Sequence, residues 1–595
     1  MFLQDKYAEA RDFLSTRVDT IKRPQDQSEA FHWIGESAYE LKDYRDAISA
    51  LNQALESAKP WDRLDATLFT RLQSELALRQ SDDALDSLNL LQQEFPDSKL
   101  VSEALLRTGE SYLEQQKFPE AIAQYRKVIT QYSESEFLPS AMYGLGWAQL
   151  RSGQFETAEA TFDELITAFP TINLAEQARV GRSIAQRRLG KTDSAIADLL
   201  AFIESATEGE RKNNSMLELG LAYVENESWP EAEATFTELL AVQPKTSLAD
   251  RAHYELAWVL KQLDKPEKAR VQFQHLIDDY PNSDLTSEAY FEVATDLYGR
   301  KQYQSAAEMF QRSLSSISST SPPDENSKDD SLAEKALYQL AWSHYQLKDF
   351  DDAAKTFATL VDEHPQSDRV GDAMFMTAQS KFQLDQFGES LAAYQAAEPI
   401  LKASPNDKTS QLRLLKLHGA QSANQVGEFQ TALDFATGLT VLQTDDSDDA
   451  DEVLIHSAWL EVAKARLALG EIDGAMDGLD RASKDLGKTG AQARVMKGDM
   501  LLEKKEYEAA INEYKLVFYG YGGTKSADEI RALQAYAIYE TARASYIRVG
   551  GASARMKPEL IEQAQKHFQY LVDNYSDQPL AEKAAQQIKT LQQLQ

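Results

Sequence analysis

The stretch Phe118-Pro119-Glu120-Ala121-Ile122-Ala123-Gln124-Tyr125 decides the fold of this chain, because its pattern recurs. The pattern is a large residue, two variable residues, an alanine, and a second large residue four positions after that alanine. Further copies are Phe155/Ala158/Phe162, Trp229/Ala232/Phe236, Tyr303/Ala306/Phe310 and Phe350/Ala353/Phe357. The alanines, which we call anchors, follow one another at steps of 37 residues: Ala10, Ala47, Ala84, Ala121, Ala158, Ala195, Ala232, Ala269 and Ala306. A fixed period of about 20–50 residues indicates a solenoid or array.

The series continues at less regular steps to the C-terminal part of the chain. Its later anchors are Ala353, Ser390, Ala432, Ala475, Ala510 and Ala564. The longer steps indicate inserted loops, because an added loop lengthens a repeat without changing its packing residues. The anchors leave no room for a separate domain, so the sequence predicts one array.

A second series of small residues lies twelve positions before the anchors. Its members are Gly35, Gly109, Gly146, Ser183, Gly220, Ala257, Ala294, Ala341, Ala378, Ala420, Ala463 and Gly498, and Leu72 is the exception. Small residues on two segments with apolar residues at helical spacing predict paired helices whose backbones approach closely. We expect Ala195→Leu to overpack such a crossing, and Gln186→Leu to act as a harmless surface change.

These residues resemble the tetratricopeptide repeat family. One good copy consists of Leu145-Gly146-Trp147, Gly153, Phe155, Ala158, Phe162 and Pro170; another consists of Leu219 to Tyr223, Trp229, Ala232, Phe236 and Pro244. The resemblance implies an all-α, right-handed superhelical solenoid of antiparallel helix pairs, named helix A and helix B. The period exceeds the usual ~34 residues of the family.

The extra residues fall in the link after helix B. That link has the form aromatic-Pro-x-Ser in Phe95-Pro96-Asp97-Ser98, and similar links occur at Tyr280–Ser283 and His364–Ser367. Proline ends helix B, and the serine is placed to cap the next helix A. The form is similar to repeats of bacterial cell-envelope proteins, the Tol-Pal coordinator and the outer-membrane assembly lipoprotein.

The predicted organisation therefore has five parts. They are a half repeat with only helix B at 1–22, a regular array at 23–313, a flexible loop insertion at 314–331, an array with longer insertions at 332–578, and a capping helix at 579–595. The first residues lack a secretory signal, and the missing first helix A leads us to expect that the chain is truncated. The acidic run 444–452 reads as an N-terminal helix extension rather than a calcium loop.

Composition restricts the kinds of partner and chemistry. The net charge of −33 argues against nucleic acid or an anionic membrane as a partner, because both would repel it. Cysteine is absent, which excludes disulfides, thiolate metal sites and cysteine nucleophiles. No run approaches the ~18 apolar residues of a membrane span.

Catalytic signatures are equally lacking. The eight histidines are scattered, without a metal-binding spacing. The glycine-rich segment 519–526 lacks the residue order of a phosphate-binding loop. We therefore predict no enzyme activity, no catalytic residue, no cofactor and no metal.

Aromatic residues gather at helix-A positions that line the concave surface in the resembled family. They are Tyr143, Trp147, Tyr254, Trp258, Phe291, Tyr298, Tyr338, Trp342, Tyr345, Phe375 and Phe382. Two interpretations stay open, namely packing between helices and a groove that binds a partner. The cations Arg251, Lys261 and Lys335 look isolated on the same face.

The sequence hypothesis is a non-enzymatic protein-interaction scaffold that binds a peptide segment or a helix in this groove. The envelope resemblance favours a periplasmic location with peripheral association with envelope complexes. The alternatives are a cytoplasmic adaptor and the regulatory repeat region of a longer enzyme.

Overall fold

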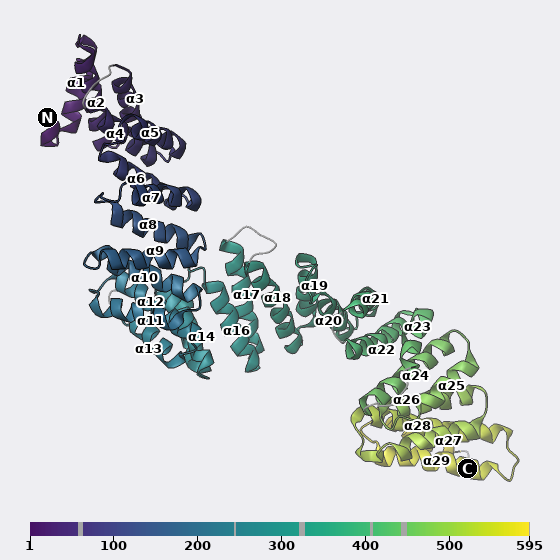
Figure 1. The fold of residues 1–595 in the computed structure, drawn as a ribbon. Helices are drawn as coiled ribbons and strands as arrows, with labels where there is room; N and C mark the ends of the chain where they lie inside the picture. The colour runs from purple at the N-terminus through teal and green to yellow at the C-terminus, as the bar shows by residue number, and fades with distance from the viewer. Residues whose placement is uncertain (58–62, 243–244, 321–327, 405–407, 442–448, 594–595) are drawn as a thin grey trace. The chain divides into compact units, whose positions relative to one another are not determined.

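The computed structural model is an array of α-helices (Figure 1). It describes residues 1–57, 63–242, 245–320, 328–404, 408–441 and 449–593. Over these ranges every regular element is a helix, so the predicted all-α fold of antiparallel helix pairs is confirmed. The chain divides into two compact units, Met1–Leu285 and Thr286–Gln595, and each is described by itself.

The first unit contains fifteen α-helices among its described residues. They are α1 (Tyr7–Ser15), α2 (Pro24–Glu40), α3 (Tyr44–Ser57), α4 (Leu64–Ala77), α5 (Ser81–Glu94), α6 (Leu100–Glu114), α7 (Phe118–Gln131), α8 (Leu138–Arg151), α9 (Phe155–Ala168), α10 (Asn173–Arg188), α11 (Thr192–Ser205), α12 (Glu210–Glu225), α13 (Trp229–Leu240), α14 (Ala249–Gln262) and α15 (Pro266–Asp279). Short 3₁₀ turns are η1 (Phe2–Gln4) and η2 (Val18–Thr20).

The second unit has the same construction over its described part. Its helices are α16 (Thr286–Gly299), α17 (Tyr303–Thr320), α18 (Lys328–Gln346), α19 (Phe350–Glu363), α20 (Val370–Gln383), α21 (Phe387–Ala403), α22 (Thr409–Val426), α23 (Phe429–Thr440), α24 (Asp449–Ala468), α25 (Ile472–Ala482), α26 (Lys488–Glu503), α27 (Tyr507–Gly520), α28 (Asp528–Ile547), α29 (Lys557–Asn574) and α30 (Pro579–Gln592). The 3₁₀ turns are η3 (Gly523–Lys525) and η4 (Arg548–Gly551).

Even-numbered helices are helices A of the repeats, and odd-numbered helices are helices B. Each helix packs against the next one along the chain within its unit. Helices A of successive repeats also touch each other, as α6 touches α8 and α8 touches α10, whereas successive helices B make no comparable contact in the described residues. The helix-A layer is therefore the more closely packed layer of each unit, and we call it the inner layer of that unit.

The anchors lie where the predicted crossing places them. All fifteen are buried, from Ala10 at 4% exposure to Ala564 at 0%. The small residues twelve positions earlier are buried as well, and so is the exception, Leu72. The two series of small side chains are thus the packing surfaces of helix A and helix B, since a larger side chain would hold the backbones apart.

The large residue four positions after the anchor packs more extensively than the sequence indicated. A Cβ atom built on Gly146 of α8 would lie 2.5 Å from Cε1 of Phe162, and one on Gly181 of α10 would lie 2.5 Å from its Cζ. The Phe162 ring of α9 therefore fills the space between helices A of two successive repeats. Tyr125 of α7 makes the same bridge between Gly109 and Gly144.

Serines of the links connect successive repeats through hydrogen bonds. Ser98 Oγ accepts a hydrogen bond from the backbone N–H of Leu100 at 3.3 Å and donates one to Asp65 Oδ2 at 2.7 Å. The first bond satisfies a free donor at the start of α6, as predicted, and the second reaches α4 of the preceding repeat. Ser283 repeats this arrangement with Leu285 and Asp250.

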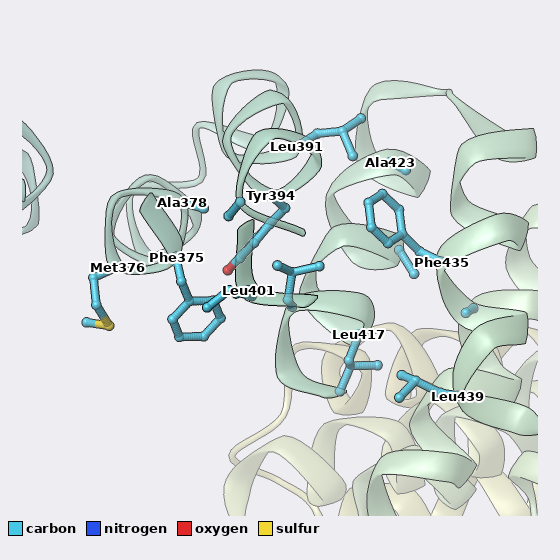
Figure 2. Close-up of a cluster of buried hydrophobic side chains, with 14 of the residues drawn as sticks. Phe375, Met376, Ala378, Leu391, Tyr394, Leu401, Leu417, Ala423, Phe435 and Leu439 are labelled. Atoms are coloured by element: carbon cyan, nitrogen blue, oxygen red, sulfur yellow. The ribbon is translucent and has the colours of Figure 1, made fainter. Parts of the chain in front are cut away.

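A continuous core runs through several repeats of the second unit. Figure 2 shows Phe375 of α20 beside Tyr394 of α21, and the two ring centroids are 6.2 Å apart. Leu417 of α22 and Leu439 of α23 belong to the same buried cluster. Each repeat therefore completes the core of its neighbours, as expected of stacked helix pairs.

Two predicted insertions differ from the structure or lie partly outside it. Helix α17 continues to Thr320 and α18 begins at Lys328, so helix replaces loop at both ends of the predicted insertion 314–331. Half-buried Leu314 packs against the core cluster that contains Phe310 and Leu340, and Leu332 is buried, so burial of these side chains favours the longer helices. Residues 321–327 lie outside the described residues. So do residues 444–448 of the acidic run, and α24 begins at Asp449.

Candidate partner-binding face

Three pairs of tyrosine and tryptophan on helices A share one geometry. Tyr143 and Trp147 of α8 have ring centroids 6.2 Å apart, and both meet the Phe162 ring edge-to-face, at 6.3 and 6.0 Å. The corresponding sets are Tyr254, Trp258 and Phe273 on α14 and α15, and Tyr338, Trp342 and Phe357 on α18 and α19. The phenylalanine is buried in each set, whereas the tyrosine and tryptophan are half-buried.

This geometry bears on both interpretations of the aromatic residues. Edge-to-face contacts of this kind stabilise the repeat by about 0.5–1.5 kcal/mol per pair. The tyrosine and tryptophan rings lie on helices A and stay partly exposed. Each pair therefore contributes to packing and also leaves ring surface that a partner could contact.

The other predicted groove residues divide into half-buried rings and one core residue. Phe291 packs against Phe310 at 5.6 Å, Tyr298 against Tyr303 at 5.2 Å, and Tyr345 against Phe350 at 5.2 Å, and the first ring of each pair is half-buried.

Phe375 is the core residue. It is only 4% exposed and lies in the core with Tyr394, so its assignment to the groove is wrong. In this repeat the position of the tryptophan is taken by Gln379, whose Oε1 accepts a hydrogen bond from the Tyr394 hydroxyl.

Two of the cations predicted to be isolated have partners. Lys261 Nζ lies 4.2 Å from the centroid of the Trp258 ring, a cation–π contact. Arg251 Nε lies 3.8 Å from Glu255 Oε1. These charges are engaged on the face, so they do not form a ready cationic clamp.

The Tyr143/Trp147 pair opens into a pocket of about 380 Å³ in the first unit. Its apolar wall continues with Val180 and Ile184 of α10, and Arg211 and Asn214 of α12 lie at its other side. The pocket thus spans helices A of three successive repeats. Val180 and Ile184 occupy the same repeat positions as Tyr143 and Trp147, so repeat alignment could have found them. Arg211 lies at the start of its helix, outside the positions that the repeat pattern marks.

Charges beside this pocket are unequally paired. Arg187 donates to Glu218 and to both carboxylate oxygens of Glu225, at 3.0 and 2.6 Å, and its side chain is only 7% exposed. Arg211, by contrast, has no ion pair with any residue that the structure describes. Burial raises the pKa of the Tyr143 hydroxyl, and the charge of Arg211 acts in the opposite direction. Arg211 is therefore close enough for its charge to be felt inside the pocket.

A second pocket, of about 460 Å³, lies around Phe382 in the second unit. Phe382 stacks on His418 with ring centroids 4.4 Å apart and planes 5° apart, so one face of its ring is covered. The lysines of this pocket are paired: Lys464 Nζ lies 2.7 Å from Glu461 Oε1, and Lys488 Nζ lies 2.5 Å from Glu529 Oε2.

The buried titratable groups have the environment of core residues. Burial lowers the pKa of His418 to about 4, and burial together with the charge of Arg63 lowers that of His32 to about 4. Both imidazoles are therefore neutral near pH 7 and hydrogen-bonded in the core, His32 to Thr67 and His418 to Gln379. Over the described ranges, no three acidic or histidine side chains gather as a metal-binding group. In the same ranges, no helix has both the length and the apolar character needed to cross a bilayer.

Comparison with known proteins gives matches to one repeat family. A family model described as tetratricopeptide repeat matches residues 69–136, 106–171, 143–210 and 217–284. A second model with the same description matches residues 29–58 and 335–367. No protein of curated function matches the sequence.

Several solved structures resemble parts of the chain or most of it. A tetratricopeptide repeat protein from Parabacteroides merdae has 16% identity and a TM-score of 0.33, over 44% of this chain and 96% of that one. PilF of Pseudomonas aeruginosa has 17% identity and a TM-score of 0.30, over 38% of this chain and 93% of that one. A chain of the Cut9–Hcn1 hetero-tetramer has 16% identity and a TM-score of 0.27, over 91% of this chain and 94% of that one.

Proposed function

The chain is a tetratricopeptide-repeat protein, and from this premise we propose that it binds a segment of a partner protein along its helix-A face. Repeats of this family form protein–protein interaction scaffolds and are typically non-catalytic. The finer proposal concerns the mode of binding. An extended peptide or a single helix of the partner lies on the inner layer, with the half-buried tyrosines and tryptophans as anchors.

The observation that carries this proposal is the recurrence of the tyrosine–tryptophan pairs. A side chain needed only for packing can be buried completely, as Phe162, Phe273 and Phe357 are. The paired rings instead keep part of their surface exposed, in three repeats and in the same orientation. Aromatic rings with a polar atom are favoured anchors at protein interfaces because they bury a large area at a small entropic cost.

The location of the protein is part of the proposal. The aromatic-Pro-x-Ser links support a periplasmic or cell-envelope scaffold of a bacterium. A cytoplasmic adaptor would use the same face, and the regulatory region of a longer enzyme would too. The reading frame upstream of Met1 separates these cases. An export signal there would indicate the envelope scaffold, a catalytic domain would indicate the regulatory region of an enzyme, and the absence of both would favour the cytoplasmic adaptor.

The binding face is tested by quantitative affinity capture followed by mass spectrometry. The test variant is Trp258→Ala/Trp342→Ala, which removes one half-buried tryptophan from each unit. The matched control is Leu200→Ala/Val271→Ala, since these apolar residues are 46% exposed on helices B. We expect the tryptophan variant to lose partners that the wild type and the control retain. Equal partner recovery by all three proteins would refute the helix-A face as the binding surface.

A further inference from the structure

We infer that the pocket at Tyr143 and Trp147 binds a partner segment in which a large apolar side chain stands within two residues of an aspartate or glutamate. This inference rests on the proposed function and adds the chemistry of the partner. It depends on three observations: the apolar side chains that line the pocket, the ion pairs of the charged side chains in and beside it, and the net charge of the chain.

The apolar part of the partner follows from the walls. Tyr143 and Trp147 line one side, and Val180, Ile184 and Phe202 continue the apolar lining. A pocket of about 380 Å³ takes one large side chain, of the size of leucine, phenylalanine or tryptophan, and leaves room for the backbone beside it. Burial of such a side chain contributes most of the affinity, because apolar area is removed from water on both partners.

The acidic part follows from Arg211. Its side chain is exposed and belongs to the first turn of α12, and no described residue forms an ion pair with it. The neighbouring carboxylate, Glu218, accepts a hydrogen bond from Arg187, which also binds Glu225. Glu218 is therefore engaged by another cation, and Arg211 is the charged side chain of the lining that has no ion pair among the described residues, so its guanidinium can bind a carboxylate of the partner.

The charge of the whole chain sharpens this choice. At a net charge of −33, a basic segment would be attracted to most of the surface, without preference for one pocket. An acidic segment is repelled from most of the surface and is attracted to a cation that has no ion pair among the described residues, such as Arg211. The aromatic wall together with Arg211, which has no ion pair in the described part of the chain, therefore favours binding of an acidic segment at this pocket.

The test is selection of random peptides displayed on phage against the full-length chain, followed by affinity measurement with synthetic peptides. We expect the selected peptides to share an apolar residue with an acidic residue within two positions. Fluorescence anisotropy with the peptide amidated at its C-terminus then restricts the carboxylate to the side chain. Loss of binding on amidation would overturn the inference, because a terminal carboxylate would be the ligand.

Three variants assign the contacts. Arg211→Glu is expected to weaken binding of the selected peptide by about tenfold and to strengthen binding of the same peptide with lysine in place of its acid. Trp147→Ala is expected to weaken both peptides. Arg188→Glu is the matched control, since this arginine is exposed on α10 and lies outside the pocket. Thermal unfolding of each variant shows that it is folded.

Failure of this inference differs from failure of the proposed function. Selected peptides that depend on Trp258 or Trp342 but not on Arg211 and Trp147 would overturn the inference and leave the helix-A binding face intact. Selected peptides that bind equally well to all of these variants would overturn both, and so would a selection without any shared motif.

Discussion

At the scale of single residues, side-chain size is the main organising variable of this protein. Every anchor is buried at the crossing of two helices, and Phe162 fills the space between Gly146 and Gly181. A ring can occupy that space only because both glycines lack a Cβ atom. The size pattern is visible in the sequence, since it requires small residues at a fixed spacing.

Enlarging an anchor is expected to destabilise its repeat. Ala195 of α11 is 0% exposed, so Ala195→Leu overpacks the crossing and costs about 1–3 kcal/mol of the free energy of unfolding. Thermal denaturation followed by circular dichroism measures the effect. The surface control predicted from the sequence, Gln186→Leu, is unsuitable because Gln186 is only 7% exposed. Ala201→Leu on the same helix is the matched control, since Ala201 is exposed. Equal melting temperatures for both variants would contradict the crossing geometry.

Burial of His418 is expected to make stability depend on pH. The pKa is about 4 in the folded chain and ~6.5 in an unfolded one, so between these values the unfolded state binds a proton that the folded state does not. The free energy of unfolding therefore falls as the pH is lowered from ~6.5 toward 4, and this group contributes no pH dependence above that window. An NMR titration of the His418 imidazole should have its midpoint well below 6. A midpoint near 6.5 would show that the ring is solvated.

At the scale of elements, the link after helix B does more than end a helix. Ser98 satisfies the start of α6 and also binds Asp65 on α4, so one side chain holds two repeats in register. The capping role could be predicted from the residue types in the link. The bond to the preceding repeat could not, because the spacing of 33 residues becomes a contact only after the helices have stacked.

Removing this serine is expected to loosen the start of one helix. Ser98→Ala deletes both hydrogen bonds and should cost about 1 kcal/mol. Hydrogen exchange followed by mass spectrometry should show faster exchange in the first turn of α6. Ser133→Ala is the control, because Ser133 is exposed in the following link and lacks a side-chain hydrogen bond among the described residues. Unchanged hydrogen exchange in the Ser98→Ala variant would contradict this expectation, because it would mean that water satisfies the start of α6 as well as the serine hydroxyl does.

At the scale of the whole molecule, stability is distributed over neighbouring repeats. Each described helix packs mainly against the helices next to it in the chain, and the core of each unit continues from repeat to repeat. In such an array the free energy is approximately a sum of repeat terms and nearest-neighbour terms. A local change should therefore have a local effect.

A reciprocal pair of variants tests this expectation. Gly146→Ala places a Cβ atom 2.5 Å from Phe162 in the first unit, and Gly498→Ala places one 2.5 Å from Tyr514 in the second. We expect each variant to raise hydrogen exchange in its own unit and to leave the other unit unchanged. Exchange that rises throughout the chain in either variant would contradict nearest-neighbour stability and would indicate one cooperative fold.

The sequence alone was sufficient to predict the helical repeat, because the period and the small residues at Gly146 and Ala158 are local consequences of how two helices cross. It was also sufficient to mark helix-A aromatics such as Trp147 as candidates for a binding face. Tertiary structure alone decided that Phe375 is core, that Gln186 is buried, and that Arg211, which lines one pocket with Trp147, has no ion pair with a described residue. These outcomes depend on which side chains of neighbouring repeats come into contact. The repeat pattern predicts where each residue lies on its helix, but it does not predict which side chains of the next repeat that residue contacts.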